Sequence, residues 1–158
     1  MSEDLIRAYR AADRDACLAL FDGNTPGFFA PSERADFVRF LERHAAEWAF
    51  QVIERDGHIV ACGGFALGTD ASTAHLCWGM VENGLHRQGL GRLLTQARLH
   101  AAAEMPGVAQ VHLDTSQHSE GFYARLGFQT ERVTVDGYGP GLDRYDMVRT
   151  VQSAMISG

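Results

Sequence analysis

The sequence has few cysteines and no long apolar run, and these absences exclude several classes of protein. Its 158 residues contain three cysteines, Cys17, Cys62 and Cys77, which are odd in number and lack C-x-x-C spacing, so neither a disulfide framework nor a zinc ribbon is expected. No apolar run approaches the roughly 18 residues that a membrane span requires. Basic residues are scattered along a chain of net charge −6, which argues against nucleic acid as a partner. We therefore expect a soluble globular protein.

Size and composition favour one cytoplasmic domain. Residues 1–4 are acidic and lack the apolar segment of a secretory signal. With 46% hydrophobic and 22% charged residues, the chain resembles an ordinary globular protein, and no linker or repeat divides it. The prediction is a single domain over residues 1–158, with a core from about residue 5 to about residue 150.

Hydrophobic periodicity predicts an alternation of strands and helices. The expected order is strand, two helices, three strands, helix, strand, helix and two strands. The expected strands cover residues 6–9, 48–54, 58–67, 73–81, 108–114, 131–135 and 144–149, and the helices begin near Asp13, Pro31, Leu90 and Ser119. A long helical crossover joins strands 73–81 and 108–114, so these two should be parallel and the others antiparallel. The fold class is mixed α+β, with helices flanking a mostly antiparallel sheet.

Strand alternation and two glycines single out the chain from His75 to Leu94. Simple alternation leaves every second residue from His75 to Val81 on one face of the sheet. Gly89 and Gly91 follow at a strand-to-helix turn, where unpaired N–H groups and the partial positive charge of a helix N-terminus can hold a phosphate. The P-loop spacing is absent, and Leu94 occupies the third glycine position of a dinucleotide fingerprint. A plain tight turn is the alternative.

Two motifs together resemble the GCN5-related N-acetyltransferase (GNAT) superfamily. They are His86-x-x-Gly89-x-Gly91 and Phe122-Tyr123-Ala124-Arg125-Leu126-Gly127-Phe128. The superfamily has [Q/R]-x-x-G-x-[G/A] after a strand and, later, an aromatic-Tyr helix that ends in Gly-Phe. His86 departs from the first signature. The resemblance extends over essentially the whole chain and implies a twisted sheet in which two neighbouring parallel strands splay apart.

The resemblance implies acetyl-CoA as cosubstrate and assigns residues to it. The main chain of Met80 and Val81 would pair with the pantetheine arm. Ser116 takes a position where many relatives contact the cofactor. The pyrophosphate would lie on the backbone amides of the turn, namely Arg87, Gln88, Gly89, Leu90, Gly91 and Arg92.

The resemblance also implies catalytic roles. Tyr123 would protonate the departing CoA thiolate, because a phenol is protonated at neutral pH. His75 is the first candidate for the base that deprotonates the amine. Glu82 is the second candidate, followed by His112 and Asp114 on the next strand. No metal site is expected.

The sequence therefore predicts an N-acetyltransferase that transfers acetyl directly to a primary amine in a ternary complex. The Val81 amide would stabilise the oxyanion, and nothing marks Cys77 as an acyl carrier. Two alternatives stay open: a noncatalytic acyl-CoA-binding sensor of the same fold, and a structural interaction module. The acceptor, a small molecule or a peptide, would contact residues 22–31 and the turn around Tyr138, with Phe28, Phe29 and Trp48 as pocket or core residues. The sequence is compatible with a homodimer.

Overall fold

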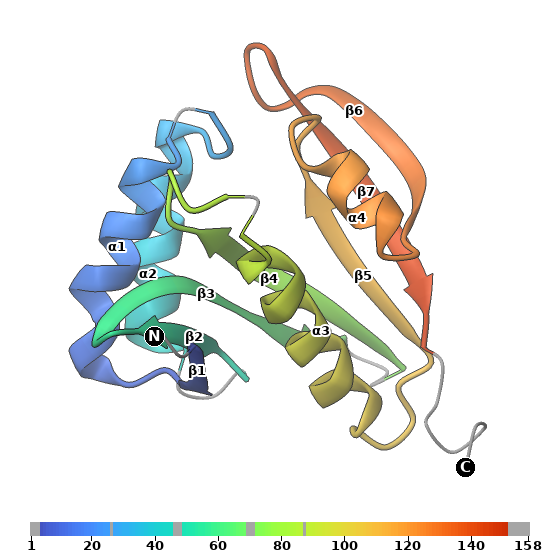
Figure 1. The fold of residues 1–158 in the computed structure, drawn as a ribbon. Helices are drawn as coiled ribbons and strands as arrows, with labels where there is room; N and C mark the ends of the chain where they lie inside the picture. Colours follow the sequence, from blue (N-terminus) through green and yellow to red (C-terminus); the bar gives the residue numbers. More distant parts are fainter. Residues whose placement is uncertain (1–3, 26, 46–48, 69–71, 87, 152–158) are drawn as a thin grey trace.

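The structure, a computed structural model, describes residues 4–25, 27–45, 49–68, 72–86 and 88–151 (Figure 1). Within these ranges the helices are α1 (Arg14–Gly23), α2 (Arg34–Arg43), α3 (Leu90–Ala103) and α4 (Glu120–Arg125), and 3-10 turns η1 (Ala11–Asp13) and η2 (Pro31–Glu33) precede the first two. The strands are β1 (Asp4–Ala8), β2 (Gln51–Arg55), β3 (His58–Leu67), β4 (Thr73–Val81), β5 (Gln110–Thr115), β6 (Gln129–Gly139) and β7 (Leu142–Thr150). This order is the predicted one, although Trp48 lies outside the described residues. No helix in the described ranges is long and apolar enough to cross a membrane.

The strands form a mixed sheet whose parallel pair lies inside it. The described residues build seven hydrogen-bonded strands in the order β1-β2-β3-β4-β5-β7-β6. Neighbouring strands are antiparallel except β4 and β5, which are parallel. The predicted mixed, mostly antiparallel sheet is confirmed. Its parallel pair joins the first four strands to the last three.

The parallel pair is held together only at its beginning. Within the described residues, the register partners of β4 and β5 are Thr73 with Gln110, Ala74 with Val111 and His75 with His112. Beyond these partners the two strands continue without pairing and diverge toward their carboxyl ends (Figure 1). The sheet is therefore split on one side, and the carboxyl ends of parallel strands are where such sheets receive ligands.

A β-bulge interrupts β4 before its open end. Two steps along β3 match three steps along β4 from Cys77 to Met80. The extra residue is accommodated at Trp78, whose φ of 51° is left-handed. As a result Cys77 shares a face with Met80 and not with Val81. The prediction of simple alternation along this strand is wrong, because the bulge inverts the faces beyond it.

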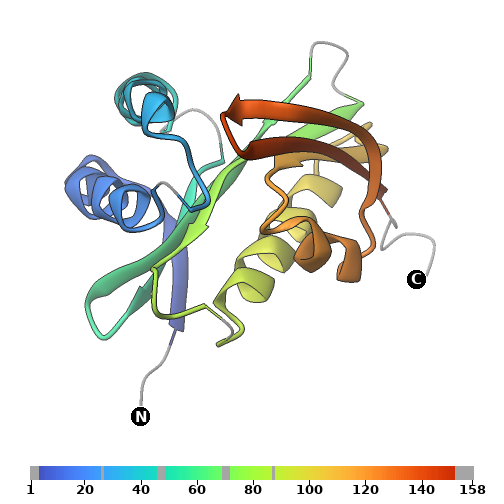
Figure 2. The ribbon, with the colours of Figure 1, turned by 90° about the horizontal axis from the view of Figure 1, so that it is seen from above.

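Helices cover both faces of the sheet and hold β4 between them. Figure 2 shows α1 and α2 on one face and α3 and α4 on the other. On the first face Phe21 and Phe37 are fully buried in one apolar cluster. On the second face α3 inserts Leu90 and Leu94 against residues of β2 and β3. Burial of each such side chain stabilises the fold by about 1.5–3 kcal/mol. The helices on both faces therefore hold β4 and its neighbouring strands in place.

The terminal hairpin reaches back over the open end of the sheet. Strands β6 and β7 are longer than predicted, so their turn extends past the end of β5. A Cβ built on Gly139 would lie 3.8 Å from the Cβ of Ala30, in the segment between α1 and α2. The hairpin and this segment therefore meet at the mouth of the opening.

Candidate active site

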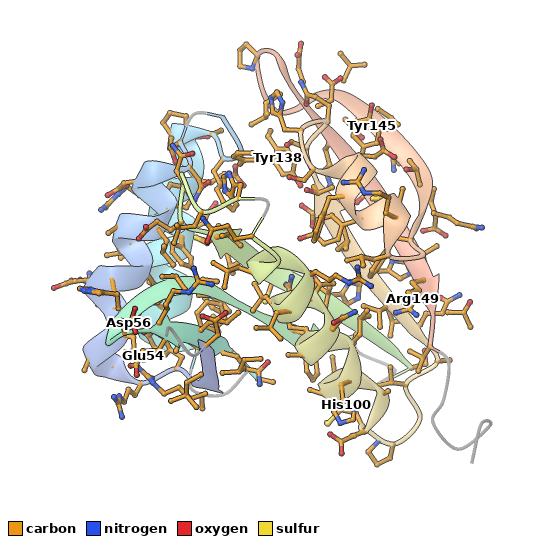
Figure 3. The ribbon with its side chains drawn as sticks, in the orientation of Figure 1. Glu54, Asp56, His100, Tyr138, Tyr145 and Arg149 are labelled. Carbon is orange, nitrogen blue, oxygen red and sulfur yellow. The ribbon has the colours of Figure 1, made fainter. Side chains whose placement is uncertain are left out.

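A cleft of about 950 Å³ lies where β4 and β5 diverge. Its walls come from the carboxyl end of β4, the first turns of α3, the end of β5, and α4. The segment after α1 and Tyr138 of the hairpin contribute at the mouth, and Figure 3 shows Tyr138 in the opening between the two halves of the sheet. The volume falls in the range of about 300–1,000 Å³ that small-molecule sites occupy.

The backbone at the end of β4 presents polar groups to the cleft. The N–H of Glu82 donates to the carbonyl of Val60 on β3 at 2.8 Å. Because successive residues of a strand direct their backbone groups to opposite edges, those of Val81 face away from β3. The carbonyl of Val81 accepts a hydrogen bond from Nδ2 of Asn24 at 2.8 Å and lies 3.1 Å from Nε2 of His86. The N–H of Val81 points to the same open edge.

The N-terminus of α3 faces the same cleft. Gly89 is its N-cap, and the carbonyl of Gly89 accepts the N–H of Leu93 at 2.9 Å. The N–H groups of the first turn have no partner within the helix and carry a partial positive charge. Gly89, Gly91 and Arg92 line the cleft, whereas the side chain of Leu90 is buried. This arrangement suits a phosphate group.

The two glycines are needed for different reasons. Gly89 has a φ of 84°, and nothing lies within 4 Å of a Cβ built there, so its requirement is conformational. A Cβ on Gly91 would lie 3.2 Å from Cζ of Phe122, so glycine lets α4 approach the first turn of α3. Arg87, which the sequence placed in this cradle, lies outside the described residues.

His86, the departure from the family signature, supports the end of β4. Besides its 3.1 Å contact with the carbonyl of Val81, its ring stands edge-on to Phe28 with 5.1 Å between centroids. Phe28 also stands edge-on to His118 at 5.9 Å. All three rings line the cleft, so His86 links β4 to the aromatic mouth.

Two residues expected at the cofactor direct their side chains elsewhere. Oε1 of Gln88 accepts a hydrogen bond from Nη1 of Arg55 at 2.9 Å. The side chain of Met80 is buried in the core beside its register partner Cys62. Any contact of Gln88 with the cofactor would therefore come from its backbone.

The end of β5 and α4 form the opposite wall. Ser116 is 2% exposed, and its carbonyl accepts the N–H groups of Ser119 and Glu120, both at 3.1 Å. Tyr123 is half-buried and packs edge-on against Phe128, with 5.9 Å between ring centroids. Both Ser116 and Tyr123 line the cleft, and the Tyr123 hydroxyl makes no hydrogen bond with a described residue.

The two bases favoured by the sequence lie outside the cleft lining. His75 is exposed at the paired end of β4, where its ring centroid is 5.5 Å from that of His112. Glu82 is exposed and lines a separate hollow between α1 and the β2–β3 hairpin. The described residues hold no group of three or more His, Cys, Asp or Glu arranged for a metal ion.

An acidic group at the mouth combines side chains from three distant segments. The hydroxyl of Tyr138 donates to Oδ2 of Asp114, and Nη2 of Arg144 lies 3.8 Å from Oδ1. Oε2 of Glu33 accepts the N–H of Ala30 at 2.8 Å. Burial raises the pKa of Glu33, and the charge of Asp114 adds to that rise. Burial and Asp114 also raise the pKa of Tyr138. Sequence analysis missed Glu33, which is an ordinary acidic residue beside a helix start.

Aromatic side chains complete the mouth. Phe28 and Phe29, which the sequence left between pocket and core, both line the cleft and are partly buried. Phe29 stacks on Phe21 with 5.0 Å between centroids and on Trp78 with 6.3 Å. An acceptor bound here would meet an apolar wall beside the acidic group.

Sequence analysis also missed two buried polar residues of α3 that line the cleft. Thr95 and Arg98 are each 1% exposed. Arg98 follows Leu90 and Leu94 at steps of four residues, so it lies on the stripe that faces the core. A charged residue on such a stripe is the signal that could have identified it.

Comparisons with known proteins agree with this geometry. Residues 15–128 match the model of the acetyltransferase (GNAT) family. No curated protein matches the sequence. Among solved structures, the ribosomal-protein-S18-alanine N-acetyltransferase from Escherichia coli has a TM-score of 0.77 at 18% identity, over 96% of each chain. The yncA protein from Salmonella typhimurium, solved with its cofactor acetyl-CoA, has a TM-score of 0.75 at 16% identity, over 95% of each chain. The N-acetylglutamate synthase from Neisseria gonorrhoeae, complexed with coenzyme A and N-acetyl-glutamate, has a TM-score of 0.73 at 19% identity, over 95% of this chain and 35% of that one.

Proposed function

The chain belongs to the acetyltransferase (GNAT) family, and from this premise we propose that it transfers an acetyl group from acetyl-CoA to a primary amine. One observation carries the proposal: a helix N-terminus suited to phosphates and an open strand edge line the same cleft. The solved relatives that hold acetyl-CoA or coenzyme A support the choice of cosubstrate.

The cleft can receive the parts of acetyl-CoA in order. The pyrophosphate would lie on the amides from Gly89 to Arg92, where the helix dipole favours negative charge. The pantetheine arm would follow the open edge of β4, as an added strand would. Ser116 and Tyr123 would contact it from the opposite wall.

Transfer proceeds by direct attack of the acceptor nitrogen on the thioester carbon. The C–N bond forms first, and the N–H of Val81 donates to the oxyanion. The C–S bond then breaks, and Tyr123 protonates the departing thiolate. Cys77 is not an acyl carrier in this scheme, because burial raises its pKa to about 11 and the thiol stays protonated at neutral pH.

We assign the role of general base to Glu33. An amine is protonated in water and must lose a proton before it attacks. Glu33 lines the cleft, and its raised pKa brings a carboxylate closer to the neutral range in which a general base works best. Asp114 adds a second negative charge that attracts the ammonium form. His75 and Glu82 lie outside the cleft lining, which argues against either as the base.

Calorimetry and an amine panel test the function. We expect acetyl-CoA to bind and free CoA thiol to be released in the presence of an acceptor amine, measured against a reaction without amine. The chain contains no lysine, so self-acetylation of lysine cannot contribute to thiol release. Absence of acetyl-CoA binding would refute the proposal. Binding without turnover across the panel would favour a noncatalytic acyl-CoA sensor.

Removal of one hydroxyl tests the acid. Tyr123→Phe should lower kcat by about 100-fold or more, with little change in acetyl-CoA affinity. Tyr145→Phe is the matched control, because Tyr145 is half-buried on β7 and lies outside the cleft lining (Figure 3). An unchanged kcat in Tyr123→Phe, or an equal loss in both variants, would exclude the acid role.

The pH profile of kcat/KM tests the base. A carboxyl group acts as a base only when it is ionised, so the rate should fall as the pH drops through the raised pKa of Glu33. Glu33→Gln should remove this acidic limb and lower the rate by about 100-fold, whereas His75→Ala should retain the limb. The reverse pattern would return the base role to His75.

A further inference from the structure

The floor of the cleft holds a buried positive charge without a counter-charge in the described part of the chain. Arg98, on the third turn of α3, lines the cleft and is 1% exposed. It takes part in no ion pair between described residues, and its Nε has no hydrogen-bond partner among them. A guanidinium keeps its charge inside proteins, and an uncompensated buried charge costs several kcal/mol. Because an unpaired buried guanidinium opposes folding, the presence of Arg98 here indicates a role in binding a negatively polarised group.

Two glycines make room for the guanidinium against the sheet. A Cβ on Gly79 would lie 2.7 Å from Nη2 and 2.9 Å from Nη1 of Arg98. A Cβ on Gly63, on the neighbouring strand, would lie 3.2 Å from Cζ and from Nη1. Gly79 follows Trp78 at the bulge of β4, so the charge lies where that strand turns toward its open end. A side chain at Gly79 would displace the guanidinium.

A second unpaired polar atom lies on the same helix face. Thr95 is 1% exposed and lines the cleft, and its Oγ1 has no hydrogen-bond partner in the described residues. Residues three apart on a helix are neighbours, so Thr95 and Arg98 present their polar groups together. Burial raises the pKa of the nearby Cys77 and Cys62 thiols, so at neutral pH neither thiol neutralises the guanidinium.

We propose that Arg98 and Thr95 form a subsite that binds a carboxylate or carbonyl oxygen of the acyl-CoA. The proposal rests on the function proposed above. Along α3, Thr95 and Arg98 lie about 6 Å and about 10 Å beyond Gly91 in the phosphate cradle, in the part of the cleft that the arm and its acyl end would occupy in the proposed complex. The charge favours a carboxylate, as at the end of a dicarboxylic acyl group. An amide carbonyl of the pantetheine arm offers the same acceptor chemistry with weaker bonds.

Calorimetry with acetyl-CoA, butyryl-CoA and succinyl-CoA distinguishes an acyl carboxylate from a pantetheine carbonyl as the oxygen that Arg98 and Thr95 bind. If the oxygen is an acyl carboxylate, the wild type binds succinyl-CoA about 10-fold or more tightly than butyryl-CoA, and Arg98→Met loses this preference. If it is a pantetheine carbonyl, Arg98→Met weakens all three by a similar factor of about 10. Unchanged affinities in Arg98→Met overturn the subsite alone. Failure of the wild type to bind any of the three overturns the proposed function as well.

Urea unfolding distinguishes this role from a structural one. Methionine removes the charge while filling the space, so Arg98→Met should unfold at the same or a higher urea concentration than the wild type. Thr95→Val keeps the side-chain shape and should also fold, with weaker acyl-CoA binding. If Arg98→Met unfolds at a lower urea concentration than the wild type, and Thr95→Val binds acyl-CoA with wild-type affinity, Arg98 is a structural residue and the proposal is refuted.

Discussion

Replacement of Gly89 by alanine should weaken acetyl-CoA binding more than it weakens the fold. With φ at 84° and nothing within 4 Å of a Cβ, the cost of the substitution is conformational. A left-handed conformation costs a non-glycine residue about 1–2 kcal/mol. The lower entropy of the unfolded alanine chain returns about 0.4–1 kcal/mol. The free energy of unfolding should therefore fall by about 1 kcal/mol, which lowers Tm by about 2–4 °C for a domain of this size.

Gly84→Ala is the matched control. Gly84 has a φ of 99°, and again nothing lies within 4 Å of a Cβ, but this residue does not line the cleft. Both variants should lose a similar amount of stability. Only Gly89→Ala should lose acetyl-CoA affinity, by about 10-fold or more, because relief of its strain turns the first amides of α3 away from the pyrophosphate. Loss of one hydrogen bond to a charged group is worth about 1.5–3 kcal/mol.

Urea unfolding measures the stability of each variant, and calorimetry measures its affinity for acetyl-CoA. Equal losses of affinity in Gly89→Ala and Gly84→Ala would mean that the effect comes from the stability of the loop. Wild-type affinity in Gly89→Ala would refute the assignment of this turn as a phosphate cradle.

Two further predictions concern other groups. Cys77→Ala should keep kcat and KM within about twofold, because a thiol with its pKa raised to about 11 is a poor nucleophile at neutral pH. Direct transfer would be contradicted if mass spectrometry found acetylated Cys77 in the wild type and Cys77→Ala were inactive. The hydrogen bond from Arg7, with Nη1 2.8 Å from Oδ2, holds the pKa of Asp13 below its usual range. This stabilisation is complete above the unfolded value of about 3.9 and is lost as the pH falls through the lowered folded value. The difference in unfolding free energy between wild type and Asp13→Asn should shrink below about pH 4, and a constant difference down to pH 3 would disprove this assignment.

The parts of the site that depend on neighbours in the chain were predictable. The turn from His86 to Leu94 follows from a strand, two glycines and a helical period, and the structure has Gly89 as the left-handed N-cap of α3. Tyr123 and Ser116, which the sequence selected, line the cleft. Their contacts with acetyl-CoA stay predictions.

The position of His75 outside the cleft lining was not predictable from spacing along β4. His75 was chosen by counting back from Val81, which assumes regular alternation and a strand open along its whole length. The structure has a bulge at Trp78 and keeps β4 paired with β5 as far as His75. Both features depend on how β4 packs between helices on the two faces of the sheet, and a single strand's sequence does not encode that packing.

By itself, the sequence determined the order of the elements, the mixed sheet, the family and the glycine turn, because periodicity, turn chemistry and short motifs act between residues close in the chain. Only the tertiary structure decided which charges meet. It brings Glu33, Asp114 and Tyr138 together from three segments at the mouth of the cleft. It also buries Arg98 against Gly79 and Gly63. Burial and electrostatic environment depend on contacts between segments far apart in the sequence, so no local pattern reveals them.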